Sequence, residues 1–309
     1  MKSLREARTR LLSWKRCSQA TQHGYEKDFQ IFSAWCREKS GREPMPCSPD
    51  TLELFVLDQL NEKGFKVTTV SRRVAAIKFL HKQQGHKNPV SEDCRDLLVN
   101  TRCLRREQQQ GKKALDPKDL VKIAKRCGKT NRGVRNRAML VFGFASGLRR
   151  SEIARLNVSD VLVTDKGVSV NLAWSKTDQT GAGRIFGIFA GERACTDPVR
   201  TMRAWLDVRG KASGPLFTRI TRKDEVTLNR IGGLYVNRVV HHAIRGIGLD
   251  PADYGAHSLR SGLVTAAAAN GATDQEIMRA SGHKSPKVMQ KYVRPVRVFA
   301  ERNPLAGVL

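Results

Sequence analysis

The sequence predicts a mainly α-helical protein with one small antiparallel β-sheet, built as a helical N-terminal domain followed by a mixed α/β C-terminal domain. The length of 309 residues suits two domains. Apolar residues in the first third recur at helical spacing, whereas strand-like alternation is found within residues 161–189. The polar residues 107–115 follow neither pattern. We therefore expect a first domain at 1–106, a linker at 107–115 and a second domain at 116–309.

Four helices are expected in the N-terminal domain, because apolar side chains recur there at spacings of three and four residues. The second helix is expected to begin at Ser48-Pro49-Asp50, which is a helix-start signal. The fourth is expected to span about Ser91 to Arg105. The apolar positions of the first three helices are Tyr25, Phe29, Phe32 and Trp35, then Leu52, Phe55, Val56 and Leu60, then Val70, Val74 and Ile77.

The third helix also carries polar side chains on the flanks of its apolar face. Hydroxyl groups mixed with guanidinium and ammonium groups suit contacts to the phosphates and bases of DNA. An ordinary solvated helix face would have a similar composition, and both interpretations stay open. The candidate DNA-binding residues are Thr68, Thr69, Ser71, Arg72, Arg73 and Lys78.

In the C-terminal domain we expect a helix from about Arg135 to Ala145 that ends at Gly147. The alternating stretches after it predict a small antiparallel sheet. Asp197-Pro198 then opens another helix, because aspartate is a good N-cap and proline fits the first turn. The expected strands lie at residues 161–163, 168–174 and 184–189, and the remainder is expected to be mostly helical.

The composition indicates a polyanionic partner. The chain has 56 Lys and Arg against 29 Asp and Glu, a net charge of +27, with +9 on residues 1–106 and +18 on the rest. Nucleic acid is the polyanion that such an excess favours, although a basic protein without a specific partner remains an alternative. Both halves are basic, so both are expected to contact the polyanion.

Other classes of protein are disfavoured. The seven cysteines form no C-x-x-C pair and their spacing is irregular, which argues against a zinc site and against a disulfide framework. The chain starts without a secretory signal and has no apolar run of membrane-span length. We expect a cytoplasmic protein with reduced thiols, no cofactor and no membrane partner.

Four fragments of the C-terminal domain carry side chains suited to phosphoryl chemistry. Arginines neutralise charge on phosphate oxygens, histidines donate hydrogen bonds or move protons, and a tyrosine can be a covalent nucleophile. No acidic cluster accompanies them, so the arginines would supply the positive charge that metal ions supply elsewhere. The fragments are Ser146-Gly-Leu-Arg-Arg-Ser-Glu152, Trp174-Ser-Lys-Thr177, His257-Ser-Leu-Arg260 and Ser281-Gly-His-Lys-Ser-Pro-Lys-Val-Met-Gln-Lys-Tyr292.

Spacing within the fragments favours convergence. His257 and Arg260 are three residues apart and would share one helical face, as would Arg149 and Glu152. A helix beginning at Ser285-Pro286 would carry Tyr292 about two turns further along. Each fragment alone has a plainer explanation, such as a surface pair, a helix stop or a packing tyrosine. All four in this order on a basic two-domain chain are much harder to explain by chance.

Together the fragments resemble the tyrosine recombinase (phage integrase) family. That family has an Arg within G-L-R-x-S-E, a Lys on a β-hairpin, H-x-x-R, and G-H followed nine residues later by Tyr. The matching residues here are Arg149, His257, Arg260, His283 and Tyr292, with Glu152 as the acidic support of the first arginine. The hairpin lacks the family's commoner G-K-G-x-K-x-R form, so Lys176 is the expected lysine and Lys166 its rival.

The resemblance implies a helical core-binding domain, a catalytic domain and a metal-free reaction. Tyr292 would attack a DNA phosphate and form a 3′-phosphotyrosine, with Arg149 and Arg260 on the phosphate, His257 and His283 assisting, and Lys176 protonating the 5′-oxygen. It also implies four protomers on double-stranded DNA at a specific site, in the recombination or integration of a mobile element. The alternatives are a type IB topoisomerase-like enzyme that relaxes DNA and a catalytically silent DNA-binding protein of the same fold.

The last residues of the chain are unusually apolar for a basic protein. They include Val298, Phe299, Leu305, Val308 and Leu309, which we expect to be buried. Pro295 and Pro304 would bracket about two helical turns. This tail is expected to pack either on its own domain or on a neighbouring protomer.

Overall fold

The computed structural model describes residues 19–107, 111–173, 183–210 and 212–297. The chain divides into two compact units, residues 1–110 and 111–309, and each is described by itself. The division falls within residues 107–115, the stretch expected to be a linker. Among the described residues, no helix combines the length and the apolar character needed to cross a membrane.

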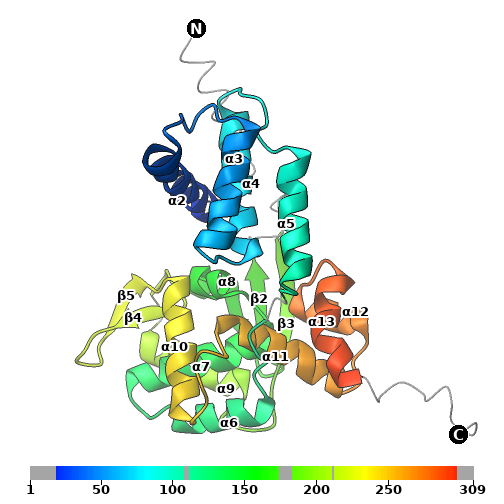
Figure 1. Cartoon of the computed structure of the whole chain (residues 1–309). Coiled ribbons are helices and arrows are strands. Elements are labelled where there is room, and N and C mark those ends of the chain that lie inside the picture. The colour runs from blue at the N-terminus through cyan, green and yellow to red at the C-terminus, as the bar shows by residue number, and fades with distance from the viewer. Residues whose placement is uncertain (1–18, 108–110, 174–182, 211, 298–309) are drawn as a thin grey trace, which may run out of the picture. The chain divides into compact units, whose positions relative to one another are not determined.

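The first unit contains the four predicted helices (Figure 1). They are α2 (Gln19–Trp35), α3 (Pro49–Leu57), α4 (Val67–Gln83) and α5 (Glu92–Leu104), and π-helical turns at Cys36–Ser40 and Asp58–Glu62 extend α2 and α3. Ser48 and Ser91 cap α3 and α5 by accepting hydrogen bonds from the backbone N–H groups of Thr51 and Cys94. Serine is favoured at these positions because its hydroxyl satisfies an N–H group that the helix leaves unpaired.

The predicted apolar faces of the first unit meet in one core. Phe32, Leu52, Phe55, Val70 and Ile77 are fully buried there. The ring of Phe55 packs edge-on against Phe32, with ring centroids 5.0 Å apart. The periodicity that predicted these helices is therefore the periodicity of burial.

The second unit is also mainly helical, and helix α7 lies at its centre. α7 packs against α9 and α11, and the core between the helices contains Phe142, Trp205 and Phe217. The predicted end of α7 at Gly147 and the predicted start of α9 at Asp197-Pro198 are confirmed. The helices are α6 (Pro117–Arg126), α7 (Asn131–Ser146), α8 (Arg150–Arg155), α9 (Pro198–Arg209), α10 (Gly233–Gly246), α11 (Ala256–Ala269), α12 (Asp274–Ser281) and α13 (Pro286–Arg297).

The predicted antiparallel sheet is present as β1 (Val161–Val163), β2 (Gly167–Leu172) and β3 (Arg184–Phe189), in the order β1-β2-β3. Leu172 pairs with Arg184 at one end of the β2–β3 pair, and Gly167 pairs with Phe189 at the other end. The second strand ends at Leu172, two residues before its predicted end. Trp174 lies outside the described residues.

A second hairpin, β4 (Thr218–Ile220) with β5 (Val226–Arg230), was not predicted. Its strands are short and its turn is held by a contact far away in sequence. The Asp224 carboxylate accepts hydrogen bonds from the backbone N–H groups of Asn131 (2.7 Å) and Arg132 (3.0 Å) at the start of α7. Sequence periodicity contains no information about such a contact.

Helices α11, α12 and α13 pack together at the C-terminal end of the second unit (Figure 1). Their small core contains Val264, Ile277, Met289 and Val293, and Tyr292 packs partly against it. Helix α13 begins at the predicted Pro286 and continues through Pro295 to Arg297. Pro295 therefore does not end this helix, and the expected helical turns between Pro295 and Pro304 lie mostly outside the described residues, as does the rest of the tail from 298 onward.

Candidate active site

The turn that ends α7 and begins α8 positions Arg149. Gly147 ends α7 in the left-handed conformation (φ 59°), which glycine adopts without strain. Two residues later, Arg149 is the N-cap of α8. Its side chain is 27% exposed and donates a 2.8 Å hydrogen bond from Nη1 to Oε1 of Glu152. The guanidinium is thus held on one side and accessible on the other.

Glu152 is a buried carboxylate that organises this turn. Its side chain is 2% exposed, and its second oxygen accepts a 2.8 Å hydrogen bond from the backbone N–H of Arg149. The carboxylate therefore binds Arg149 through both the main chain and the side chain. The predicted supporting role of Glu152 agrees with this geometry.

Helix α11 carries His257 and Arg260 on one face, as their spacing predicts. The start of this helix is fixed by Asn237 on α10, whose Oδ1 accepts a 2.8 Å hydrogen bond from the N–H of Ala256. Gly255 precedes it, and a Cβ at that position would lie 3.0 Å from the same oxygen. Asn237 therefore orients the turn from which His257 projects.

Arg260 is almost fully buried, at 2% exposure. Its Nη1 donates hydrogen bonds of 2.6 Å to the carbonyl oxygens of Gly147 and Ser281, which ties α7 and α12 together. Its Nη2 is buried and has no partner among the described residues. Burial and the positive charge of Arg149 lower the pKa of Arg260 to about 10. A buried cation with an unused donor is a favourable place for an anion.

His283 lies directly beside Arg260. Its Nδ1 is 2.7 Å from Oγ of Ser281, and its Nε2 accepts a 3.4 Å hydrogen bond from Nε of Arg260. Burial, followed by the charges of Arg260 and Arg149, lowers the pKa of His283 to about 4. The imidazole is therefore neutral at physiological pH.

Tyr292 on α13 meets His257 across the site. The tyrosine Oη lies 3.0 Å from Nε2 of His257, and the ring centroids are 6.1 Å apart. Desolvation, then the charges of Arg260 and Arg149, lower the pKa of His257. A neutral imidazole at this distance can accept the phenol proton.

The structure describes only one of the two candidate lysines. Lys176 lies outside the described residues. Lys166 is exposed in the turn between β1 and β2, where its carbonyl oxygen accepts a hydrogen bond from Ala190. That turn is at the end of β2 opposite to Leu172 and Arg184, about 20 Å away at about 3.3 Å per residue.

Three further residues support the site and were not singled out from the sequence. Asn237 and Ser281 act through the hydrogen bonds described above, and the charge of Arg184 at the start of β3 interacts with that of Glu152. Their partners lie 19, 2 and 32 residues away. Only Ser281, adjacent to the G-H pair, could have been found by inspecting the motif.

The candidate DNA-binding residues of α4 fall into two groups. Thr68, Arg72 and Lys78 are exposed, and Thr69 and Ser71 are half-buried. Arg72 pairs with Asp28 at 2.8 Å. Arg73, in contrast, is 7% exposed, donates a hydrogen bond to Gln59 and lies over the ring of Phe65. Arg73 is thus enclosed by the first unit and does not present its guanidinium on the surface.

The site in the second unit combines two guanidinium groups, two neutral imidazoles and a phenol. Arg149 and Arg260 can stabilise negative charge on phosphorus-bound oxygens, and Tyr292 and His257 are close enough for a phenol nucleophile and an imidazole base to act together. Within the residues that the structure describes, no group of His, Cys, Asp and Glu is arranged to hold a metal ion. The arrangement is suited to nucleophilic attack on a phosphodiester.

Comparison with known proteins agrees with this chemistry. Residues 113–297 match the model of the phage integrase family. The chain is 31% identical to an integrase/recombinase XerD homolog of Selenomonas ruminantium, with 91% of this chain and 83% of that protein covered. It is 24% identical to the recombinase Cre of Escherichia phage P1, with 94% and 89% covered.

The fold is shared with a solved structure as well. A lambda integrase dimer bound to a COC′ core site superimposes with a TM-score of 0.62 at 15% identity, over 98% of both chains. The family match covers more than half of the chain, and the four fragments occur in it in the expected order. The chain therefore belongs to the phage integrase family and is an enzyme of the tyrosine recombinase type.

Proposed function

We propose that the protein cleaves and rejoins double-stranded DNA at a specific site through a 3′-phosphotyrosyl intermediate on Tyr292. One observation carries the proposal. The Oη of Tyr292 is 3.0 Å from a neutral base, His257, within a site where the buried cation Arg260 has a buried donor without a partner among the described residues. A backbone phosphate would satisfy that donor and place its phosphorus near the phenol.

The reaction conserves the phosphodiester bond. The Tyr292 oxygen forms a bond to phosphorus as its proton passes to His257, and the bond from phosphorus to the 5′-oxygen breaks. Arg149 and Arg260 bind the non-bridging oxygens as charge builds on them. Lys176 gives the departing 5′-oxygen its proton. Rejoining reverses these steps with a new 5′-hydroxyl, so no high-energy cofactor is consumed.

The position of Lys166 favours Lys176 as the proton donor. Lys166 lies at the end of the β2–β3 pair opposite to Arg184, whose charge interacts with that of Glu152. A Lys176→Ala variant is expected to cleave slowly and to recover on a substrate whose 5′-bridging oxygen is replaced by sulfur, because a thiolate leaves without protonation.

The net charge of the chain and its similarity to known proteins both indicate DNA as the substrate. The net charge is +27, and the similar lambda integrase structure is a complex with its core site. Exchange of strands between two duplexes requires a cleaving tyrosine for each of four strands, which leads us to propose a tetramer on paired sites. The exposed residues of α4, namely Thr68, Arg72 and Lys78, are proposed to contact DNA, together with Thr69 and Ser71.

The test is covalent trapping on a nicked suicide duplex that carries the protein's own site. The wild-type protein is expected to yield a complex stable to denaturant, with the DNA 3′ end attached to Tyr292 by peptide mapping. Tyr292→Phe is expected to bind the duplex with unchanged affinity and to yield no adduct. An adduct in that variant would refute the assignment of the nucleophile.

A further inference from the structure

Arg184 at the start of β3 lies among the charged groups of the active site, although it belongs to none of the matching fragments. Its pKa is lowered by burial and by the charge of Arg149, with an opposing contribution from Glu152. Arg184 in turn contributes to the lowered pKa of Arg260. The charges of Arg149, Arg184 and Arg260 therefore interact with one another and with the buried carboxylate of Glu152.

The contacts of Arg184 lead to the end of α12. Its Nη1 donates a 3.2 Å hydrogen bond to the carbonyl oxygen of Arg279, in the last turn of that helix. A cation and donor at a helix C-terminus stabilises the carbonyl groups that the helix leaves unpaired. The guanidinium also stacks on Phe186, with Cζ 4.1 Å from the ring centroid, which fixes its direction.

Gly282 shows how closely Arg184 packs against this turn. Gly282 ends α12 with φ 70°, and a Cβ at that position would fall 2.3 Å from Nη1 of Arg184. The guanidinium thus occupies the space that a side chain would fill. The residues on either side of Gly282 are Ser281 and His283, and both belong to the site.

Ser281 and His283 are the residues that hold Arg260 from this side. The carbonyl oxygen of Ser281 accepts a 2.6 Å hydrogen bond from Arg260, and the hydroxyl of Ser281 orients the His283 ring at 2.7 Å. A displacement of the turn around Gly282 would therefore move His283 and release one of the two carbonyl contacts of Arg260.

We propose that Arg184 is a positioning residue of the active site, which fixes the C-terminal turn of α12 and thereby sets His283 and Arg260 against the scissile phosphate. This inference rests on the proposed phosphotyrosyl reaction. Arg184 acts on the groups that bind the phosphate and not on the departure of the 5′-oxygen.

The test compares single-turnover formation of the covalent adduct at saturating protein. Arg184→Ala is expected to lower the cleavage rate by about 10- to 100-fold, the effect of losing a hydrogen bond from a charged group, with unchanged DNA affinity. Arg184→Lys keeps the positive charge but lacks the planar guanidinium, and its cleavage rate is expected to lie between those of the wild-type protein and Arg184→Ala. If thermal melting shows that Arg184→Ala does not fold, the test uses the cleavage rate of Arg184→Lys relative to that of the wild-type protein.

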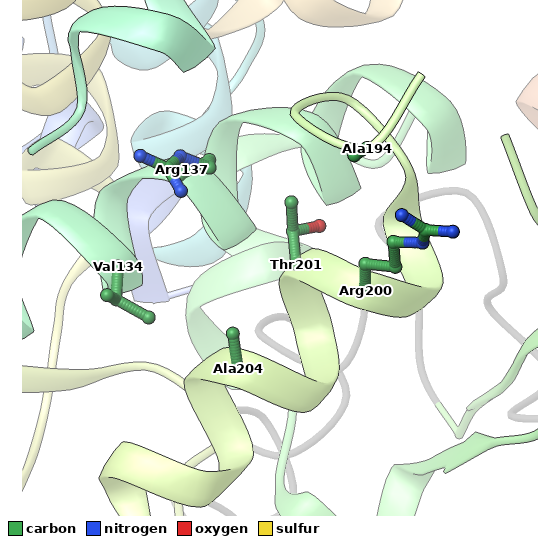
Figure 2. Close-up of a pocket in the computed structure, with 6 residues that line it drawn as sticks. All are labelled: Val134, Arg137, Ala194, Arg200, Thr201 and Ala204. Carbon is green, nitrogen blue, oxygen red and sulfur yellow. The ribbon is translucent and has the colours of Figure 1, made fainter. Parts of the chain in front are cut away.

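The matched control is Arg137→Ala. Arg137 donates hydrogen bonds to the carbonyl oxygens of Ala124 (2.9 Å) and Cys127 at the end of α6, and it lines a pocket with Arg200 and Thr201 (Figure 2). It therefore holds a helix end as Arg184 does, about 15 Å along α7 from Gly147. This variant is expected to cleave at the wild-type rate.

A 5′-bridging phosphorothiolate substrate separates the two ways in which Arg184 could act. Cleavage by Arg184→Ala is expected to remain slow on it, whereas Lys176→Ala recovers. Recovery of Arg184→Ala on this substrate, a wild-type rate on normal DNA, or a defect shared by Arg137→Ala would each overturn the inference. Failure of the wild-type protein to form any adduct would instead overturn the proposed reaction.

Discussion

Protonation of His283 should make the stability of the second unit depend on pH. The pKa of its imidazole falls from 6.5 to about 4 in the folded protein, because the ring is buried beside Arg260 and Arg149. Between these two pH values the unfolded chain binds a proton that the folded chain does not bind. The folded state therefore loses stability as the pH falls from about 6.5 to about 4. Above about pH 6.5, titration of His283 does not lower the stability.

The size of the effect follows from the pKa shift. Each pKa unit corresponds to about 1.4 kcal/mol, so the shift of His283 amounts to about 3 kcal/mol at pH 4 relative to pH 7. With a urea dependence of about 2 kcal/mol per M, that is a change of about 1–2 M in the unfolding midpoint. A His283→Asn variant lacks this titration and should be less sensitive to pH by that amount.

The measurement is urea unfolding of the full chain at pH 7 and at pH 4.5. Unfolding is monitored by pulsed hydrogen exchange in peptides of the second unit. The His283→Asn protein is expected to lose about 2–3 kcal/mol less than the wild-type protein between the two pH values. His242→Asn, at an exposed position on α10, is the control and should follow the wild type. Equal losses in all three proteins would refute the burial of a neutral imidazole at His283.

Three other outcomes are expected. Covalent cleavage should survive EDTA, because Arg149 and Arg260 supply the positive charge at phosphorus, and rescue of an EDTA-inhibited reaction by added Mg²⁺ would contradict this. DNA affinity should fall steeply with salt, with a slope near −0.9 per phosphate contacted, and each unit expressed alone should bind much more weakly than the full chain, because tethering raises the effective concentration. Truncation after Arg297, the last residue of α13, should spare binding of one protomer but abolish cooperative filling of a two-site duplex, and a truncated protein that recombined normally would exclude docking of the tail on a neighbouring protomer.

Much of the fold could be predicted because local patterns coincide with burial. Phe32, Leu52 and Ile77 stand at helical spacing and are all fully buried. The starts of α3 and α9 were predicted because a cap residue followed by proline signals a helix start by local chemistry alone. Strand β2 alternates apolar and polar residues from Val168 to Leu172, whereas the turn of the β4–β5 hairpin is fixed by the contact of Asp224 with the start of α7.

The flanks of a helix show where local patterns fail. Arg72 and Arg73 are adjacent on α4 and equally polar, and both were candidates for contacting DNA. Arg72 is exposed, but Arg73 turns inward to Gln59 and Phe65, which come from residues before the helix. The apolar residues of a helix show which face is buried only to within about one residue. A long side chain at the edge of that face can therefore point either into the protein or into solvent.

Motifs in the sequence indicated the candidate site residues, but the hydrogen bonds that hold them in place could not be predicted. Motif spacing brought together Arg149, His257 and Tyr292, but it gave no indication that Arg184 would reach the end of α12, 95 residues later. Such contacts arise from tertiary packing, which places β3 beside the Gly282 turn.

The charges of the site explain why it should respond to DNA. The positive charges of Arg149, Arg184 and Arg260 interact with one another and with a single carboxylate, Glu152, so the free site holds an excess of positive charge. Burial, together with that excess, lowers the pKa of Arg260 to about 10 and the pKa of His283 to about 4. A bound phosphate would offset the excess charge and raise both pKa values toward their ordinary range.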